Sequence, residues 1–211
     1  MCWAVDDRNA GRAGNYRCVI CRRACGYSKA MEKFIVNKLV EEYTHLMFGL
    51  IQHIDYFTPL RTEGEAEDRY NLTETIEALD LVPAGWKKQT SGFGYGFVDS
   101  SGNMIFPFVR NKKITFDLLL WKDKRDGSEN TKNLCFELFN NMLQPLHGSL
   151  FLAGLWRTNH PSEDLYYYGD KYCGAKKKCL RSATMSDIQS ICNSCSSKEE
   201  NCIIVWELDN T

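Results

Sequence analysis

Two Cys-x-x-Cys pairs carry the clearest chemistry in this chain of 211 residues. Cys18 and Cys21 lie near its start, and Cys192 and Cys195 lie near its end. Two such pairs that converge in space supply the four thiolates of a tetrahedral structural zinc site. Their separation far exceeds the spacing of a zinc ribbon, so convergence requires the two ends of the chain to meet. We therefore predict structural zinc held by these four cysteines.

The remaining cysteines leave other chemistry open. Cys25 or Cys173 could replace any one of the four zinc ligands, and of the 10 cysteines only Cys135 lies in the central region. Disulfides in an oxidising compartment and free thiols are the alternatives to zinc. The uneven placement predicts that the two ends of the chain, rather than its core, need covalent or metal support.

No catalytic constellation is visible among the histidines. His45 and His53 are eight residues apart and share a similar face of a predicted helix, which would suit a catalytic or metal pair, but ordinary surface histidines are the expectation. Cys135 and His147 could form a nucleophile pair, yet no local signature surrounds either residue. The sequence thus favours a non-enzymatic protein, with an enzyme of unrecognised site as an alternative.

Two aromatic segments are ambiguous. The run from Gly92 to Gly96 alternates glycine with Phe93 and Tyr95, but it lacks the Lys-Ser/Thr pair of a phosphate loop. Glycines in a strand more often mark close backbone approach. The run Tyr166-Tyr167-Tyr168 suits either a protein interface or a core.

The overall charge of the chain gives no sign of a strongly charged partner. The chain has 26 basic and 27 acidic residues and a net charge of −1, so we expect no nucleic-acid or membrane partner. The run of three lysines at 176–178 reads as solvated loop charge. Residues 1–17 do not resemble a signal peptide, which leads us to expect a cytoplasmic or nuclear protein.

A long amphipathic helix is the strongest element signal. Ser28 can cap its start, and Pro59 disfavours its continuation beyond Phe57. A charged loop is predicted over 60–73. Apolar residues recur in the helix at steps of three and four: Met31, Phe34, Ile35, Leu39, Tyr43, Leu46, Met47, Leu50, Ile51 and Ile54.

The middle of the chain predicts an antiparallel sheet. Residues 93–109 form a hairpin around a polar turn, and 113–121 forms a third strand. A second helix over 131–143, a strand over 149–156 and a final strand over 202–206 follow. This order predicts an α+β fold, with an antiparallel sheet flanked by two main helices and with cysteine-rich termini. The predicted parts are a cysteine-containing arm (1–27), an α+β core (28–156) and a cysteine-rich segment that packs back on the core (157–211).

The segment Leu81-Val82-Pro83-Ala84-Gly85-Trp86, followed by two aromatic-rich strands joined at Asp99-Ser100-Ser101-Gly102, resembles the FP domain. That domain is shared by the proteasome-inhibitor protein and an F-box-only ubiquitin-ligase subunit, and the resemblance covers about residues 29–150. It implies docking or dimerisation through sheet and helix surfaces, with a proteasome or ubiquitin-ligase subunit as partner.

Three hypotheses of function follow. The first is a non-enzymatic protein–protein interaction module, an adaptor or regulator of the proteasome or ubiquitin pathway. The second is a zinc-stabilised accessory protein of unrelated function, such as a viral protein, and the third is an enzyme with an unrecognised site. Ile114, Phe116, Leu118 and Trp121 supply more apolar bulk than one sheet face needs, so we expect a second copy or another protein to cover part of the sheet.

Overall fold

The computed structural model describes residues 14–57, 70–91, 94–120, 129–157, 165–194 and 202–209. Within the first and fourth of these ranges, side chains are described from residues 29 and 131 onward. Most of the predicted loop at 60–73 and residues 1–13 of the predicted arm lie outside the described residues.

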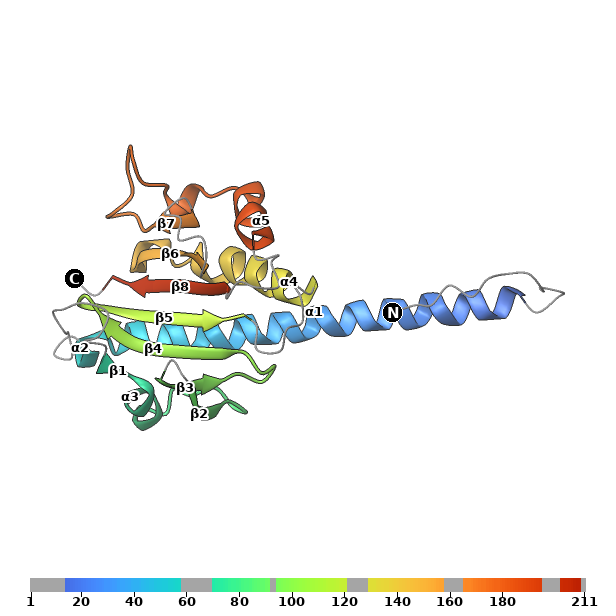
Figure 1. Cartoon of the computed structure of the whole chain (residues 1–211), viewed down its shortest axis with the longest axis horizontal. Coiled ribbons are helices and arrows are strands. Elements are labelled where there is room, and N and C mark those ends of the chain that lie inside the picture. Colours follow the sequence, from blue (N-terminus) through green and yellow to red (C-terminus); the bar gives the residue numbers. More distant parts are fainter. Residues whose placement is uncertain are drawn as a thin grey trace.

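A long first helix, α1 (Gly14–Gln52), dominates the outline of the molecule (Figure 1). Its 39 residues correspond to about 58 Å of helix. The described residues from Val36 to Leu50 bury one face against the rest of the chain, whereas none of residues 29–35 is buried. The sequence predicted a start at Ser28, but the helix begins at Gly14, because extending a formed helix costs far less than nucleating one.

The sheet is antiparallel throughout its described strands, and its order is β2-β3-β4-β5-β8-β6-β7, with β1 paired to β4. The final strand β8 therefore lies in the middle of the sheet, between β5 and β6. The fold is α+β, as predicted. The strands are β1 (Tyr70–Asn71), β2 (Lys87–Ser91), β3 (Gly94–Val98), β4 (Met104–Arg110), β5 (Lys113–Leu119), β6 (Leu150–Arg157), β7 (Tyr166–Tyr168) and β8 (Cys202–Leu208).

Shorter helices complete the fold. The predicted second helix is α4 (Glu129–Leu138), which continues into a π-helical turn, η2 (Phe139–Leu143), before Pro145. The helix α5 (Met185–Asn193) begins at a capping box between Thr184 and Asp187. The remaining helical segments are α2 (Ile54–Phe57), α3 (Thr73–Ala78), η3 (His147–Ser149) and η5 (Leu180–Ser182).

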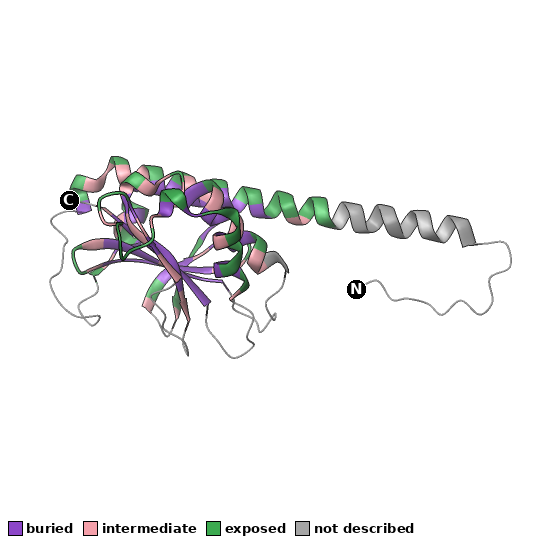
Figure 2. Ribbon diagram, turned by 90° about the horizontal axis from the view of Figure 1, so that it is seen from above, coloured by how far each residue is buried: buried purple, intermediate pink, exposed green. Residues whose placement is uncertain are grey.

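The sheet is buried on both faces (Figure 2). One face forms the main core with α1, α4 and α5, around large side chains such as Tyr43, Phe116 and Trp206. The other face carries a second buried apolar cluster of Met104, Phe106, Phe108, Leu119, Ile203 and Val205. Apolar residues are thus buried on both faces of the described strands, and coverage of part of the sheet by a second copy or another protein stays a prediction.

The predicted corner at Trp86 is confirmed. Trp86 is 7% exposed, and its ring centroid lies 4.9 Å from that of Tyr43 on α1 and 6.3 Å from that of Phe97 on β3. Its indole Nε1 donates a hydrogen bond to Glu42 Oε2 at 2.8 Å. The corner thus joins α1 to the sheet.

Candidate functional site

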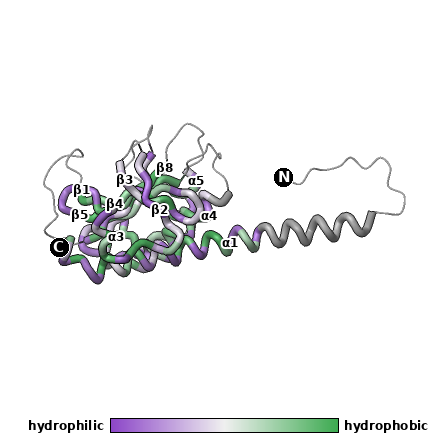
Figure 3. The backbone as a smooth tube through the Cα atoms, turned by 90° about the horizontal axis from the view of Figure 1, so that it is seen from below, coloured by the Kyte–Doolittle hydropathy of each residue, from purple (hydrophilic) through white to green (hydrophobic). Residues whose placement is uncertain are grey.

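The part of α1 that emerges from the sheet carries exposed apolar side chains. Met31 is 43% exposed, Phe34 64% and Ile35 43%. Figure 3 shows this emerging part of α1 extending beyond the strands. We call residues 29–35 the neck. Clustered exposed apolar groups mark binding surfaces. The neck is therefore the first part of a candidate interaction site.

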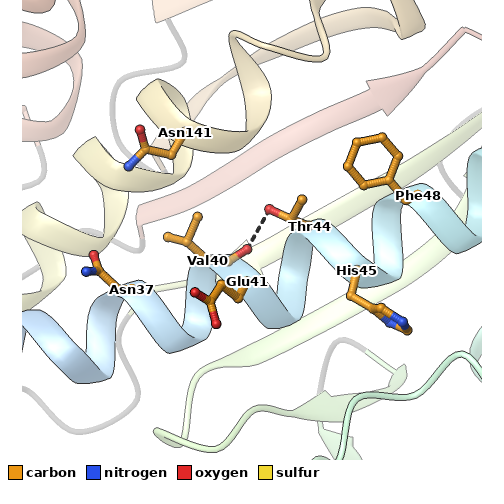
Figure 4. Close-up of a pocket in the computed structure, with 7 residues that line it drawn as sticks. All are labelled: Asn37, Val40, Glu41, Thr44, His45, Phe48 and Asn141. Atoms are coloured by element: carbon orange, nitrogen blue, oxygen red, sulfur yellow. Dashed lines mark hydrogen bonds between the residues drawn. The ribbon is translucent and has the colours of Figure 1, made fainter.

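A groove between α1 and α4–η2 forms the second part of the site (Figure 4). One stretch has a volume of about 570 Å³ and is lined by Asn37, Val40, Glu41, Thr44, His45, Phe48 and Asn141. An adjacent stretch of about 630 Å³ is lined by Lys29, Glu32, Lys33, Val36, Asn37, Asn133 and Glu137. Asn37 lines both stretches, so the groove runs from the neck along the helix pair. We call it the α1–α4 groove.

Each wall of the groove is formed by residues that recur along a helix at the spacing of one helical turn. On α4–η2 the lining residues Asn133, Glu137 and Asn141 recur every four residues, and Asn141 donates a hydrogen bond to Glu137. On α1, Phe48 is 51% exposed beside this wall, and the Thr44 hydroxyl donates to the Val40 carbonyl at 2.6 Å. Two helical walls with apolar and polar positions at helical spacing suit an incoming amphipathic helix.

Buried polar contacts hold α1 in the position that shapes the groove. The Tyr43 hydroxyl donates to Asp99 Oδ2 at 2.8 Å, and Asp99 Oδ1 accepts the backbone N–H groups of Ser101 and Asn103. Burial, and then the charge of Asp99, raises the pKa of Tyr43 well above its ordinary value. The turn between β3 and β4 is thereby tied to α1, a role that the sequence did not reveal.

The cysteines of the described chain form disulfides. Cys135 on α4 is bonded to Cys192 on α5, Cys173 is bonded to Cys179, and Cys202 is disulfide-bonded as well. A cysteine in a disulfide offers no thiolate to a metal.

The predicted zinc ligands are not brought together among the described side chains. Cys192 and the alternate ligand Cys173 are in disulfides, while Cys18, Cys21, Cys25 and Cys195 lie outside the described side chains. No group of three His, Cys, Asp or Glu residues suited to a metal ion occurs within the described ranges. The zinc site stays a prediction for the reduced protein.

The described histidines, His45, His53 and His147, lie in three separate places, and His160 is outside the described residues. His45 is exposed at the α1–α4 groove, while His53 is half-buried with its ring 5.9 Å from that of Tyr56. His147 Nδ1 lies 2.9 Å from Asp170 Oδ2. Cys135 is fully buried in its disulfide, so it is not available as a nucleophile for His147.

The described parts of the two aromatic segments belong to the sheet, while Gly92 and Phe93 lie outside the described residues. Gly96 lies in β3, where a Cβ atom would come within 2.4 Å of the Ile105 carbonyl oxygen, so close backbone approach explains this glycine. The three tyrosines at 166–168 form β7, in which Tyr167 is buried and the other two are half-buried. They are part of the packed structure rather than an open interface.

Comparison with known proteins gives no relative: neither a scan against protein-family models nor searches of curated proteins and of solved structures found a match. Among the described helices, none is both long enough and apolar enough to cross a membrane. The site is therefore interpreted from its own geometry, an exposed helical segment beside a groove between two helices.

Proposed function

We propose that this protein is a non-enzymatic assembly subunit, in which the neck of one copy docks into the α1–α4 groove of the next copy. The observation that carries the proposal is the exposure of Met31, Phe34 and Ile35 on a helix that extends beyond its own domain. Burying an exposed apolar side chain of this size contributes about 1.5–3 kcal/mol.

The geometry of the two surfaces predicts the kind of assembly. The inserting side chains are Met31, Phe34 and Ile35 of the neck. The receiving surface is the stretch of the groove that extends along α1 from Asn37 to Phe48, and none of the inserting side chains lines it. Because these are different patches of one chain, the contact is heterologous, and repeated heterologous contacts give rings or open filaments. A closed dimer is not the expected end state.

Charge also favours a second copy as occupant. The sequence of α1 ahead of the neck includes Arg17, Arg22 and Arg23. The groove is lined by three carboxylates, of Glu32, Glu41 and Glu137, against two ammonium groups, of Lys29 and Lys33. Opposite charges on the inserting and receiving parts favour association and fix its register.

The disulfides favour an oxidising compartment for this assembly. Structural disulfides such as Cys135–Cys192 persist in secreted and extracytoplasmic proteins and are rare in the cytosol. We therefore place the assembly outside the reducing cytoplasm, in contrast to the cytoplasmic or nuclear expectation. The proteasome or ubiquitin-ligase partner implied by the FP resemblance stays a prediction that the disulfides do not favour.

A mixing experiment tests both surfaces. Phe34→Glu removes the apolar neck but leaves the groove intact, and Phe48→Glu does the reverse. We expect wild-type protein to form large species in light scattering, each variant alone to be monomeric, and the mixture to form one-to-one dimers only. Tyr95→Glu, at another exposed aromatic on β3, is the matched control and should assemble like wild type.

Two results would contradict the proposal. Wild-type protein that remains monomeric at every concentration would remove the assembly function. Variants that assemble as well as wild type would show that neither the neck nor the groove is the contact.

A further inference from the structure

An acceptor triplet for N-linked glycosylation lies where β1 is followed by α3. Asn71-Leu72-Thr73 is the only Asn-x-Ser/Thr triplet in the sequence, and such triplets accept N-linked glycans in secreted proteins. Asn71 ends the short strand β1, and Thr73 begins α3. Among the described strands β1 pairs with β4 alone, so the triplet lies at an edge of the sheet.

The hydrogen bonds of the Asn71 side chain are compatible with a substituent on its amide nitrogen. The residue is half-buried, and its Nδ2 donates a solvent-exposed hydrogen bond of 2.7 Å to the Tyr95 carbonyl. Its Oδ1 accepts the backbone N–H of Thr73 at 2.9 Å. Because a carboxamide nitrogen carries two hydrogens, replacing one of them with a sugar leaves the other for the bond to Tyr95.

The neighbours of Asn71 are open to solvent. Tyr70 is 42% exposed, Tyr95 is 57% exposed, and Glu74 is exposed in the first turn of α3. A glycan is bulky and extends into solvent, so it needs an attachment point of this kind at the surface.

The Thr73 hydroxyl, in contrast, has no use in the folded structure. Thr73 is 1% exposed, and its Oγ1 has no hydrogen-bond partner within the described chain. A buried hydroxyl without a partner costs stability, and a valine of the same shape avoids that cost. The acceptor triplet supplies a reason for the hydroxyl, because its third residue must be serine or threonine.

We infer that Asn71 carries an N-linked glycan, a modification that goes beyond the assembly proposed above and relies only on its oxidising compartment. The acceptor is the chain before it folds, because Leu72 and Thr73 are buried afterwards. The donor is an oligosaccharide linked to a lipid diphosphate. Asn71 Nδ2 forms a bond to C1 of the first sugar, and the bond from C1 to the diphosphate breaks. The lipid diphosphate leaves with the electron pair, and the proton lost from Nδ2 passes to a base of the transferase.

The glycan is compatible with assembly through the neck. Asn71 lies outside residues 29–35, and it lines neither stretch of the α1–α4 groove. A bulky glycan at the edge of the sheet therefore leaves both docking surfaces free, and it keeps this edge in contact with solvent.

Secretion of the full chain from a eukaryotic cell behind a cleavable leader tests the inference. We expect wild-type protein to lose mass on digestion with peptide N-glycosidase F, and peptide mapping to find aspartate in place of Asn71. Thr73→Ser keeps the triplet and should behave in the same way. Thr73→Val removes only the acceptor hydroxyl, so it should have the mass of the bare chain, like Asn71→Gln.

Unfolding of bacterially produced, oxidised protein tests the argument from Thr73. Without a glycan, Thr73→Val should unfold at a denaturant concentration no lower than that of wild type, because the fold loses an unpaired hydroxyl and keeps its shape. A clearly lower midpoint would show that the fold itself needs the hydroxyl and would contradict this argument.

The remaining outcomes separate this inference from the proposed assembly. A chain secreted with Cys135 bonded to Cys192 but with the mass of the bare chain overturns the glycosylation and leaves the assembly standing, as does a glycan mapped only to another residue. A chain glycosylated at Asn71 that stays monomeric in light scattering supports the glycosylation and removes the assembly.

Discussion

Truncating Trp86 to alanine tests how α1 is fixed to the sheet. The side chain is 7% exposed, and it fills the space between Tyr43 on α1 and Phe97 on β3. Cavities left by such large-to-small changes cost about 3–5 kcal/mol. The indole also donates to Glu42, which retains other partners in Ser100 and Lys38, so the lost hydrogen bond adds only about 1 kcal/mol. We therefore expect the free energy of unfolding to fall by about 4–6 kcal/mol.

Urea unfolding of the oxidised protein, followed by circular dichroism, measures this loss. Trp86→Phe is the matched control: it keeps most of the aromatic packing but cannot donate to Glu42, so it should cost roughly 1–2 kcal/mol. A Trp86→Ala protein with the wild-type unfolding midpoint would refute the reasoning that this corner anchors α1. Equal losses in the two variants would instead assign the whole effect to the hydrogen bond.

Two further predictions concern the disulfides and the tyrosines. Replacing Cys135 and Cys192 with serine removes a crosslink between residues 57 apart, which should lower the free energy of unfolding by about 4 kcal/mol in a chain-entropy model. Replacing Cys173 and Cys179 opens a shorter ring and should lower it by only about 2 kcal/mol. Denaturant titration of both double variants checks this order. Burial raises the pKa of Tyr166 from 10.0 to about 12. Because the pKa of Tyr166 is higher in the folded than in the unfolded state, its contribution to stability is fully present below pH 10 and is lost as the pH rises toward 12. The denaturant midpoint of unfolding should therefore decline across this window, and it should decline less in Tyr166→Phe.

The periodic elements were predictable because burial imposes a local pattern. The face of α1 from Val36 to Leu50, the hairpin of β3 and β4 and the burial of Trp86 all follow from apolar spacing and from turn residues. The insertion of β8 between β5 and β6 did not follow, because the pairing of strands far apart in sequence depends on tertiary packing.

Less of the candidate site could be predicted from the sequence. Cysteine spacing suggested zinc, but pairing in space decides between metal and disulfide, and Cys135 is bonded to Cys192 across 57 residues of chain. The sequence placed Phe34 in the buried stripe of the helix, yet Phe34 lies, like Phe48, on the exposed side of α1. Lys38, Glu41 and His45 lie on the same side of the helix wheel as these two phenylalanines, and their polar character could have shown that this side is exposed.

Photo-crosslinking from the neck tests the central claim most directly. A benzoylphenylalanine placed at Phe34 should react with the chain that covers it, and mass spectrometry of the crosslinked peptides identifies the attachment site. The proposed assembly predicts attachment to the α1–α4 groove of another copy, around Thr44 to Phe48 or Asn141. Attachment to position 34 of a second copy would indicate a symmetric dimer, and the absence of any crosslink between copies at assembling concentrations would contradict docking of the neck.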